Sequence, residues 1–325
     1  MKNIAIVCGG YSGEYPISVQ SAEMVKKNLD KTKYISYIIF IEKDSWYYKD
    51  ENNNKHIINK NDFTIELDGN TIKFDGVFNA IHGTPGEDGK LLGYFDLLNI
   101  PYTSCDMDTS ALTFNKYLCN KFVQSLGINV AHSFSFVKGD KINKSDVVKT
   151  LGLPIFVKPA RSGSSVGVSK VNTIEEFDTA IELAYEADDR ILIEETIVGR
   201  EIACGLFLKD NKLMVLPLTE IISKHDFFDY EAKYTAGLAD EITPPDNLSL
   251  DHETDIKAIS ALLYNKLGCK GLVRVDYILS KTNLYFIEIN SVPGMSGASI
   301  IPKQAEAMGI TIGDLFDAVV ENMFN

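Results

Sequence analysis

The chain has 325 residues, of which 45% are hydrophobic and 24% charged, and it carries a formal net charge of −13. This length exceeds one ordinary hydrophobic core, so two or three domains are expected. The acidic balance argues against nucleic acid or an anionic membrane as a partner, because both require basic surfaces.

The cysteines point to a reducing compartment. They are five in number, widely scattered and without a C-x-x-C pair, which argues against a disulfide framework or a zinc site. We interpret them as buried free thiols. The apolar run at the N-terminus is too short for a signal peptide, and no segment approaches the roughly 20 apolar residues of a membrane span. A cytoplasmic protein is expected.

Strands and helices are predicted to alternate over the first hundred residues. The first strand is a continuous apolar run, which is typical of a strand buried in a parallel sheet. Strands are expected over residues 4–8, 34–41 and 76–81, and helices over 16–29 and 91–98. The pattern predicts an open parallel-sheet α/β domain over residues 1–108.

The remaining residues predict two α+β units, over 109–200 and 201–325. The first would open with one long helix over 109–126, with Asp108 as its N-cap. The T-x-x-E pattern at the start of the helix expected over 173–187 indicates a capping box. Further strands are expected over 153–158, 166–171, 190–195, 201–208 and 213–222, a helix over 251–267, a hairpin over 271–279 and 284–290, and two short helices at the end. Residues 223–250 form a long polar stretch, and such a loop is usually functional or disordered.

The segments RVD and EIN in the last predicted hairpin are the strongest chemical signal. Side chains alternate along a strand, so Arg274 shares a face with Asp276, and Glu288 shares one with Asn290. If the strands pair, Asp276, Glu288 and Asn290 converge as oxygen ligands suited to Mg²⁺. A solvated face with a surface ion pair is the weaker alternative, because lone carboxylates on otherwise apolar strands would be costly.

A loop rich in Gly and Ser follows Lys158. Small residues let backbone N–H groups approach phosphate oxygens, and the lysine adds a positive charge. No G-K-[ST] follows the glycines, so the loop is not a P-loop. An ordinary hairpin turn is the alternative, but beside the metal cluster we favour a flap over nucleotide phosphates.

Weaker motifs also place polar groups at the ends of predicted strands. The carboxylates of EETIVGRE (194–201) could bind a ribose or an adenine amino group, or could belong to a solvated strand. Glu14 follows the first strand, where doubly wound folds bind ligands, and would suit an amine. His82 follows another parallel strand, although a lone histidine is more often structural.

In this order, the motifs resemble the D-alanine–D-alanine ligase family of the ATP-grasp superfamily over nearly the whole chain. The motifs are GGYSGE (9–14), HGTPGEDG (82–89), the helix with Lys116, VKPARSGSSVG (157–167), EETIVGRE (194–201), DYEAKY (229–234), RVD (274–276) and EINSVPGMSGASIIP (288–302). The resemblance implies a two-part ATP-grasp fold after the N-terminal domain, with residues 223–250 closing as a lid. It also implies a homodimer.

The resemblance further implies a reaction in peptidoglycan precursor synthesis. ATP phosphorylates the carboxylate of one D-alanine, and the amine of a second attacks the acylphosphate. Two Mg²⁺ ions, which Mn²⁺ could replace, would be the cofactors. The implied metal ligands are Asp276, Glu288 and Asn290, and the implied ATP-binding residues are Lys116, Lys158, Ser164, Ser165, Glu194, Glu195, Ile197, Glu201 and Lys233. Glu14 and His82 would bind the first D-alanine, Ser299 and Ile300 the second, and the catalytic residues would be Glu14, Ser164, Tyr234, Arg274 and Gly294. No role is predicted for Ser162.

Other functions stay open on the sequence. A relative that makes D-alanyl-D-lactate or D-alanyl-D-serine is the first alternative, and the Lys233-Tyr234 pair, the family's D-alanine pattern, favours the dipeptide instead. HGTPGEDG and the region around Ser299 argue against another ATP-grasp carboxylate–amine ligase. The complete metal triad argues against a non-catalytic nucleotide-binding module.

Overall fold

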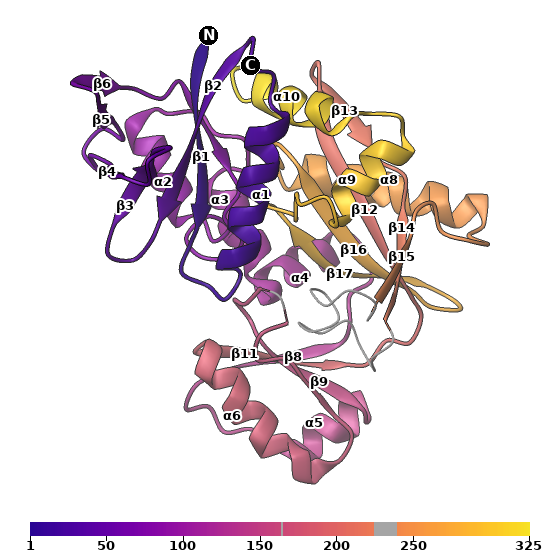
Figure 1. Ribbon diagram of the computed structural model, residues 1–325. Coiled ribbons are helices and arrows are strands. Elements are labelled where there is room, and N and C mark those ends of the chain that lie inside the picture. The colour runs from indigo at the N-terminus through magenta and orange to yellow at the C-terminus, as the bar shows by residue number, and fades with distance from the viewer. Residues whose placement is uncertain (164, 224–238) are drawn as a thin grey trace.

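The computed structural model describes residues 1–163, 165–223 and 239–325 (Figure 1). Its strands are β1 (Lys2–Gly9), β2 (Tyr34–Ile41), β3 (Trp46–Lys49), β4 (Lys55–Ile57), β5 (Ile65–Leu67), β6 (Asn70–Ile72), β7 (Gly76–Asn79), β8 (Ser133–Val137), β9 (Ile155–Pro159), β10 (Ser169–Val171), β11 (Arg190–Glu195), β12 (Arg200–Lys209), β13 (Lys212–Val215), β14 (Thr219–Ser223), β15 (Ala239–Ile242), β16 (Val273–Leu279) and β17 (Leu284–Asn290). Its helices are α1 (Tyr15–Asn28), α2 (Lys90–Leu98), α3 (Met107–Phe114), α4 (Lys116–Ser125), α5 (Lys144–Leu151), the 3₁₀ turn η1 (Ile174–Glu176), α6 (Phe177–Ala187), α8 (Leu250–Lys266), α9 (Ile300–Ala307) and α10 (Ile312–Asn322). Within these residues, no helix combines the length and the apolar character needed to cross a membrane.

The predicted α/β fold is confirmed, with one correction to the N-terminal sheet. The sheet has the order β4-β3-β2-β1-β7, and β1, which lies between β2 and β7, is fully buried from Ile4 to Cys8. Strand β1 pairs in parallel with β2 and β7, whereas β3 and β4 add antiparallel edges. The sheet is therefore mixed rather than wholly parallel.

The carboxyl ends of β1 and β7 bring two of the motifs together. Parallel neighbours end at the same edge of a sheet, so the loops that follow them run side by side. Tyr11 N–H donates to Thr84 O at 2.8 Å, and Ser12 Oγ–H donates to His82 O at 3.1 Å. Glu14, directly before α1, is thereby fixed next to the 82–89 loop.

Two antiparallel sheets make up the rest of the fold. One has the order β10-β9-β11-β8 and is covered by α5 and α6; the other has the order β15-β14-β12-β16-β17, with β13 paired to β12. The predicted hairpin of β16 and β17 is confirmed. Helix α10 packs back on the N-terminal sheet, where the rings of Phe316 and Phe78 lie 5.8 Å apart in one shared core.

The helix predicted over 109–126 is wrong as a single element, and the break positions Lys116. Asn115 leaves helical geometry, with φ −89° and ψ 96°, and its side chain caps α4 by accepting from Leu118 N–H. Lys116 N–H donates instead to Ala160 O at 2.9 Å. The N-cap of α3 is Asp106, which accepts from Thr109 N–H, and not Asp108.

Smaller corrections concern where individual helices and strands begin and end. Thr173 makes no side-chain cap, and the Glu176 carboxylate accepts from Asn172 N–H at 2.7 Å rather than from Thr173 N–H, so the predicted capping box is wrong. The strand predicted over 213–222 is divided into β13 and β14, and β10 starts only at Ser169. The polar stretch contains β15, which pairs with β14, while residues 224–238 lie outside the described part of the chain. Strand β8 and helix α5 were not predicted.

Candidate functional site

Two cavities of the described structure meet at a common wall. One of about 230 Å³ lies between the N-terminal loops, the ends of β16 and β17 and the start of α9. The other, of about 190 Å³, lies between the two antiparallel sheets. Lys116, Ser162 and Glu288 line both cavities. Among the described residues, these three therefore mark the place where a group held in one cavity can meet a group held in the other.

The common wall of the two cavities, formed by Lys116, Ser162 and Glu288, is positioned in part by the pairing of β16 with β17. Asp276 lies opposite Glu288, and Arg274 lies opposite Asn290, as the alternation predicted. The Arg274 guanidinium donates to both carboxylate oxygens of Asp276, at 2.8 Å from Nε and 2.6 Å from Nη2. Asn290 Nδ2 donates to the same carboxylate at 3.0 Å. Burial opposes the charge of Arg274, but the attraction of Asp276 outweighs it and raises the pKa of the guanidinium.

Lys116 closes the wall from the other side. Its ammonium donates to Glu288 Oε2 at 2.8 Å and to the carbonyl of Ser162 at 3.1 Å. Burial disfavours the charged lysine, but the charge and hydrogen bond of Glu288 more than offset this and raise the pKa of Lys116. Lys116 therefore stays protonated, and Ser162, which had no predicted role, helps to hold it.

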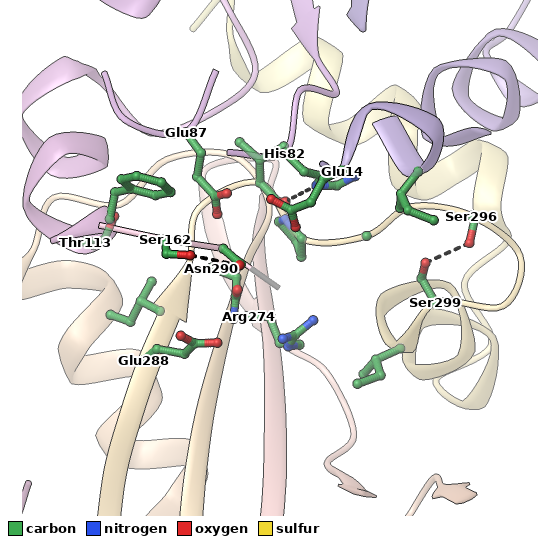
Figure 2. Close-up of a pocket in the computed structure, with 18 of the residues that line it drawn as sticks. Glu14, His82, Glu87, Thr113, Ser162, Arg274, Glu288, Asn290, Ser296 and Ser299 are labelled. Carbon is green, nitrogen blue, oxygen red and sulfur yellow. Dashed lines mark hydrogen bonds between the residues drawn. The ribbon is translucent and has the colours of Figure 1, made fainter. Parts of the chain in front are cut away.

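The oxygen donors of β16 and β17 fit a hard divalent cation. Asp276, Glu288 and Asn290 supply two carboxylates and one amide oxygen from adjacent register positions, and such donors suit Mg²⁺. Figure 2 shows two of them, Glu288 and Asn290. No three carboxylate, imidazole or thiolate groups cluster for metal binding in the described ranges; the candidate donors are two carboxylates and the amide of Asn290. Arg274 and Lys116 now neutralise the two carboxylates.

The second cavity contains the residues predicted for a nucleotide. Lys158 and Glu194, on neighbouring strands, form an ion pair of 2.5 Å that is largely buried. Asn120 Nδ2 also donates to Glu194, at 3.2 Å. The other predicted residues of this cavity that the structure describes also line it: Ser165, Glu195, Ile197 and Glu201. Glu195 accepts from His132 N–H at 2.8 Å, so one of its oxygens is already engaged by the backbone.

Sequence reasoning missed several residues that line this cavity, among them Asn120 and Phe156. Asn120 lies four residues after Lys116 on α4, and this spacing places both on one helix face, which was a usable signal. Phe156 alternates with Lys158 along β9, so both point from the same face of the strand.

Replacing Lys158 with Met tests the link between this ion pair and nucleotide binding. The variant removes a cation from the cavity and leaves the Glu194 carboxylate buried without it, so we expect ATP to bind at least about tenfold more weakly. Equilibrium displacement of a fluorescent nucleotide measures the effect, with exposed Lys209→Met on β12 as the matched control. A change confined to the Michaelis constant of the amino acid would place Lys158 in another subsite.

The first cavity holds His82 in one protonation state. Its Nδ1 lies 2.8 Å from the carbonyl of Val292, which can only accept, so Nδ1 carries a proton. Its Nε2 lies 3.1 Å from Ser21 Oγ. Burial lowers the pKa of His82, so the ring is neutral and Nε2 accepts from the serine. The histidine thereby fastens the 291–299 loop to the N-terminal unit.

Glu14 lies where the Gly-Ser loop reaches the N-terminal unit. It is buried and lines the first cavity. A Cβ atom added to Gly163 would lie 2.5 Å from Glu14 Oε2, so only glycine lets the loop come this close. The carboxylate is held within reach of a ligand bound beside Lys116.

Gly294 and the start of α9 form the far end of this cavity. A Cβ atom on Gly294 would lie 2.7 Å from Ser299 Oγ, which shows how tightly the loop packs on the helix. Ser299 is the N-cap of α9, but its hydroxyl bonds Ser296 Oγ at 2.9 Å and makes no cap. The first N–H groups of α9, including that of Ile300, therefore remain unpaired within the helix, an arrangement that favours a carboxylate.

Glu87 is a further carboxyl of this cavity to which the sequence assigned no role. It is 8% exposed, and its Oε2 accepts from Gly83 N–H at 2.9 Å. Burial, followed by the charge of Glu14, raises the pKa of Glu87 to about 7. Ser164, Lys233 and Tyr234, which the motifs also selected, lie outside the described residues.

Comparisons with known proteins match the whole length of the chain. The family models "D-ala D-ala ligase N-terminus" and "D-ala D-ala ligase C-terminus" match residues 3–105 and 122–321. A D-alanine–D-alanine ligase of Flavobacterium johnsoniae is 46% identical, covering 99% of both chains. One of Azobacteroides pseudotrichonymphae is 43% identical over 99% of this chain and 100% of its own.

Solved structures agree in fold. A D-alanyl-alanine synthetase A of Vibrio cholerae gives a TM-score of 0.90 at 28% identity, covering 100% of this chain and 99% of its own. A D-Ala:D-Ser ligase of Enterococcus faecalis gives 0.85 at 33% identity, with 99% of both covered. A D-alanine–D-alanine ligase of Bacillus anthracis complexed with ATP gives 0.79 at 28% identity, covering 100% and 98%. Because both family models and full-length relatives match it, the chain belongs to the D-alanine–D-alanine ligase family.

Proposed function

We propose that this chain joins two molecules of D-alanine to D-alanyl-D-alanine at the expense of ATP, releasing ADP and phosphate. The observation that carries this proposal is the wall shared by the two cavities. A nucleotide in the cavity of Lys158 would point its terminal phosphate at Lys116. An amino acid in the cavity of Glu14 would present its carboxylate at the same place.

In the first step, the terminal phosphoryl group of ATP is transferred to a carboxylate oxygen of the first D-alanine. Glu14 holds the ammonium of this D-alanine, and the neutral ring of His82 forms a fixed wall beside it. Lys116 and Lys158 offset the charge of the phosphates. Ser165, Glu194, Glu195, Ile197 and Glu201 hold the nucleotide. Asp276, Glu288 and Asn290 would bind two Mg²⁺ ions, or Mn²⁺, which supply further charge neutralisation on the phosphates.

In the second step, the neutral amine of the second D-alanine attacks the acyl carbon, and a tetrahedral intermediate forms. The intermediate then expels phosphate, and the proton lost by the nitrogen passes to phosphate or solvent as the amide forms. The unpaired N–H of Ile300 and the Ser299 hydroxyl take the carboxylate of this D-alanine. Arg274 and the backbone N–H of Gly294 stabilise the negative oxygen of the tetrahedral intermediate. For Ser164, Lys233 and Tyr234 the proposal rests on the motifs alone: they would close the site and exclude water from the acylphosphate.

Phosphate release from ATP tests the function when D-alanine, L-alanine, D-serine and D-lactate are compared in parallel. We expect release with D-alanine and none with L-alanine, together with a dipeptide identified by mass spectrometry. D-serine and D-lactate belong in the assay because the D-Ala:D-Ser ligase is 33% identical to this chain. Release that depended on D-serine or D-lactate as the preferred acceptor would change the proposed product, and release without any D-alanine would contradict the function.

The cellular compartment and the oligomeric state of the protein are also proposals. Five cysteines, all buried and unpaired, suit a reducing compartment, and we place the protein in the cytoplasm as a homodimer, as the family resemblance implies.

A further inference from the structure

Glu87 has a carboxyl group that the proposed mechanism does not use. It comes from the loop after β7, lines the substrate cavity, and is more than nine-tenths buried. Its Oε2 is anchored by Gly83 N–H. No other hydrogen bond reaches this carboxyl from the part of the chain that the structure describes. Figure 2 shows Glu87 and Glu14 both directed into the cavity.

We propose that Glu87 is a second carboxyl of the subsite for the ammonium of the first D-alanine, and that it makes the enzyme select a donor with an ammonium group. This inference rests on the proposed function, because it names a residue for the donor of that reaction. Glu14 and Glu87 approach the same space from two loops that lie side by side. An ammonium between them can donate to both, whereas a donor with a hydroxyl or methyl group in its place brings no positive charge to the two carboxyls.

The charged groups around Glu87 make the protonation of its carboxyl sensitive to a bound cation. The charged groups that face Glu87 are Glu14 from the loop before α1, Glu288 from β17 and Lys116 from α4. Lys116 is already engaged by Glu288 and the Ser162 carbonyl, so it does not neutralise Glu87 directly. His82 is neutral and held by its two hydrogen bonds. Glu87 therefore retains a proton near neutral pH when no ammonium is present, and it releases this proton when one binds.

Binding of the D-alanine ammonium is expected to strengthen as the pH rises. The pKa of Glu87 is raised to about 7, so above pH 7 this carboxyl is ionised and the subsite binds the ammonium most tightly. Below pH 7 a proton must leave first, and binding weakens as the pH falls. Glu87→Gln keeps the acceptor for Gly83 N–H but removes this ionisation. The variant should raise the Michaelis constant of the donor D-alanine about tenfold at pH 8, while kcat changes far less.

Isothermal titration calorimetry of D-alanine in buffers of different ionisation enthalpy tests the proposal. The wild-type protein should release up to about one proton on binding between pH 6 and 7.5, and Glu87→Gln should release close to none. Glu23→Gln is the matched control, because Glu23 is exposed on α1. Competition between D-alanine and D-lactate as donors should favour D-alanine less in Glu87→Gln than in the control.

Two results would overturn the inference. One is proton release by Glu87→Gln equal to that of the wild type, with an unchanged Michaelis constant. The other needs no variant, and so holds even if Glu87→Gln fails to fold: a wild-type protein that binds D-alanine with no proton release across this range. Neither result would contradict the proposed function, which is tested separately by D-alanine-dependent phosphate release by the wild type.

Discussion

Replacement of Glu288 by Gln is expected to reduce turnover about a thousandfold or more while the chain stays folded. Glu288 lies in the wall shared by the two cavities, opposite Asp276. Glutamine keeps the shape of the side chain but removes a negative charge from the three oxygen donors. It also removes the ionic partner of Lys116, so the lysine is no longer held in place for the phosphates.

The measurement is phosphate release from ATP and D-alanine at low and high Mg²⁺, beside a thermal unfolding curve. Glu306→Gln is the matched control, because Glu306 is an exposed glutamate on α9. The control should retain wild-type rates. Full activity of Glu288→Gln at ordinary Mg²⁺ concentration would defeat the assignment of this wall as the reaction centre.

Replacement of Arg274 by Met is expected to lower both turnover and stability. The guanidinium is the bidentate partner of Asp276, which is 4% exposed. Removing one partner of a buried ion pair leaves the other uncompensated, which costs about 3–5 kcal/mol of unfolding free energy. Turnover should fall by about a hundredfold to a thousandfold, because the oxyanion of the intermediate loses a donor.

A double variant separates the two effects. Arg274→Met with Asp276→Leu removes both charges and should regain most of the stability, since buried ion pairs contribute little net free energy over apolar residues. It should remain inactive, because a proposed cation ligand is also lost. Urea denaturation and phosphate release are the two measurements. A single Arg274→Met variant with wild-type turnover would show that the guanidinium does not contact the reacting atoms.

The elements that the sequence determined are those whose pattern is local. The run from Ile4 to Cys8 is apolar at every position, which suits burial on both faces, and it is fully buried in β1 between β2 and β7. Alternation alone placed Arg274 beside Asp276, and Glu288 beside Asn290, and the hairpin pairs these positions. The order of the motifs was sufficient for the family, because each motif is a short segment that needs no partner in order to be read.

The tertiary structure decided what depends on distant partners. The helix ends at Asn115 because that side chain caps a new helix and Lys116 N–H bonds Ala160, a residue far along the chain. Glu87 looked like one polar residue of a loop, and it became a buried carboxyl only when the loop met the strand of Glu288 and the helix of Lys116.

The ion pairs of the site also depend on contacts between segments that are distant in the sequence. Lys158 and Glu194 face each other only because β9 and β11 pair, and Ser162 holds Lys116 only because the Gly-Ser loop folds over α4. A sequence pattern reports which side of its own strand or helix a residue occupies. Which charge meets which, and how deeply both are buried, is fixed by the packing of elements against one another, and burial and charge pairing are what set the chemistry of this site.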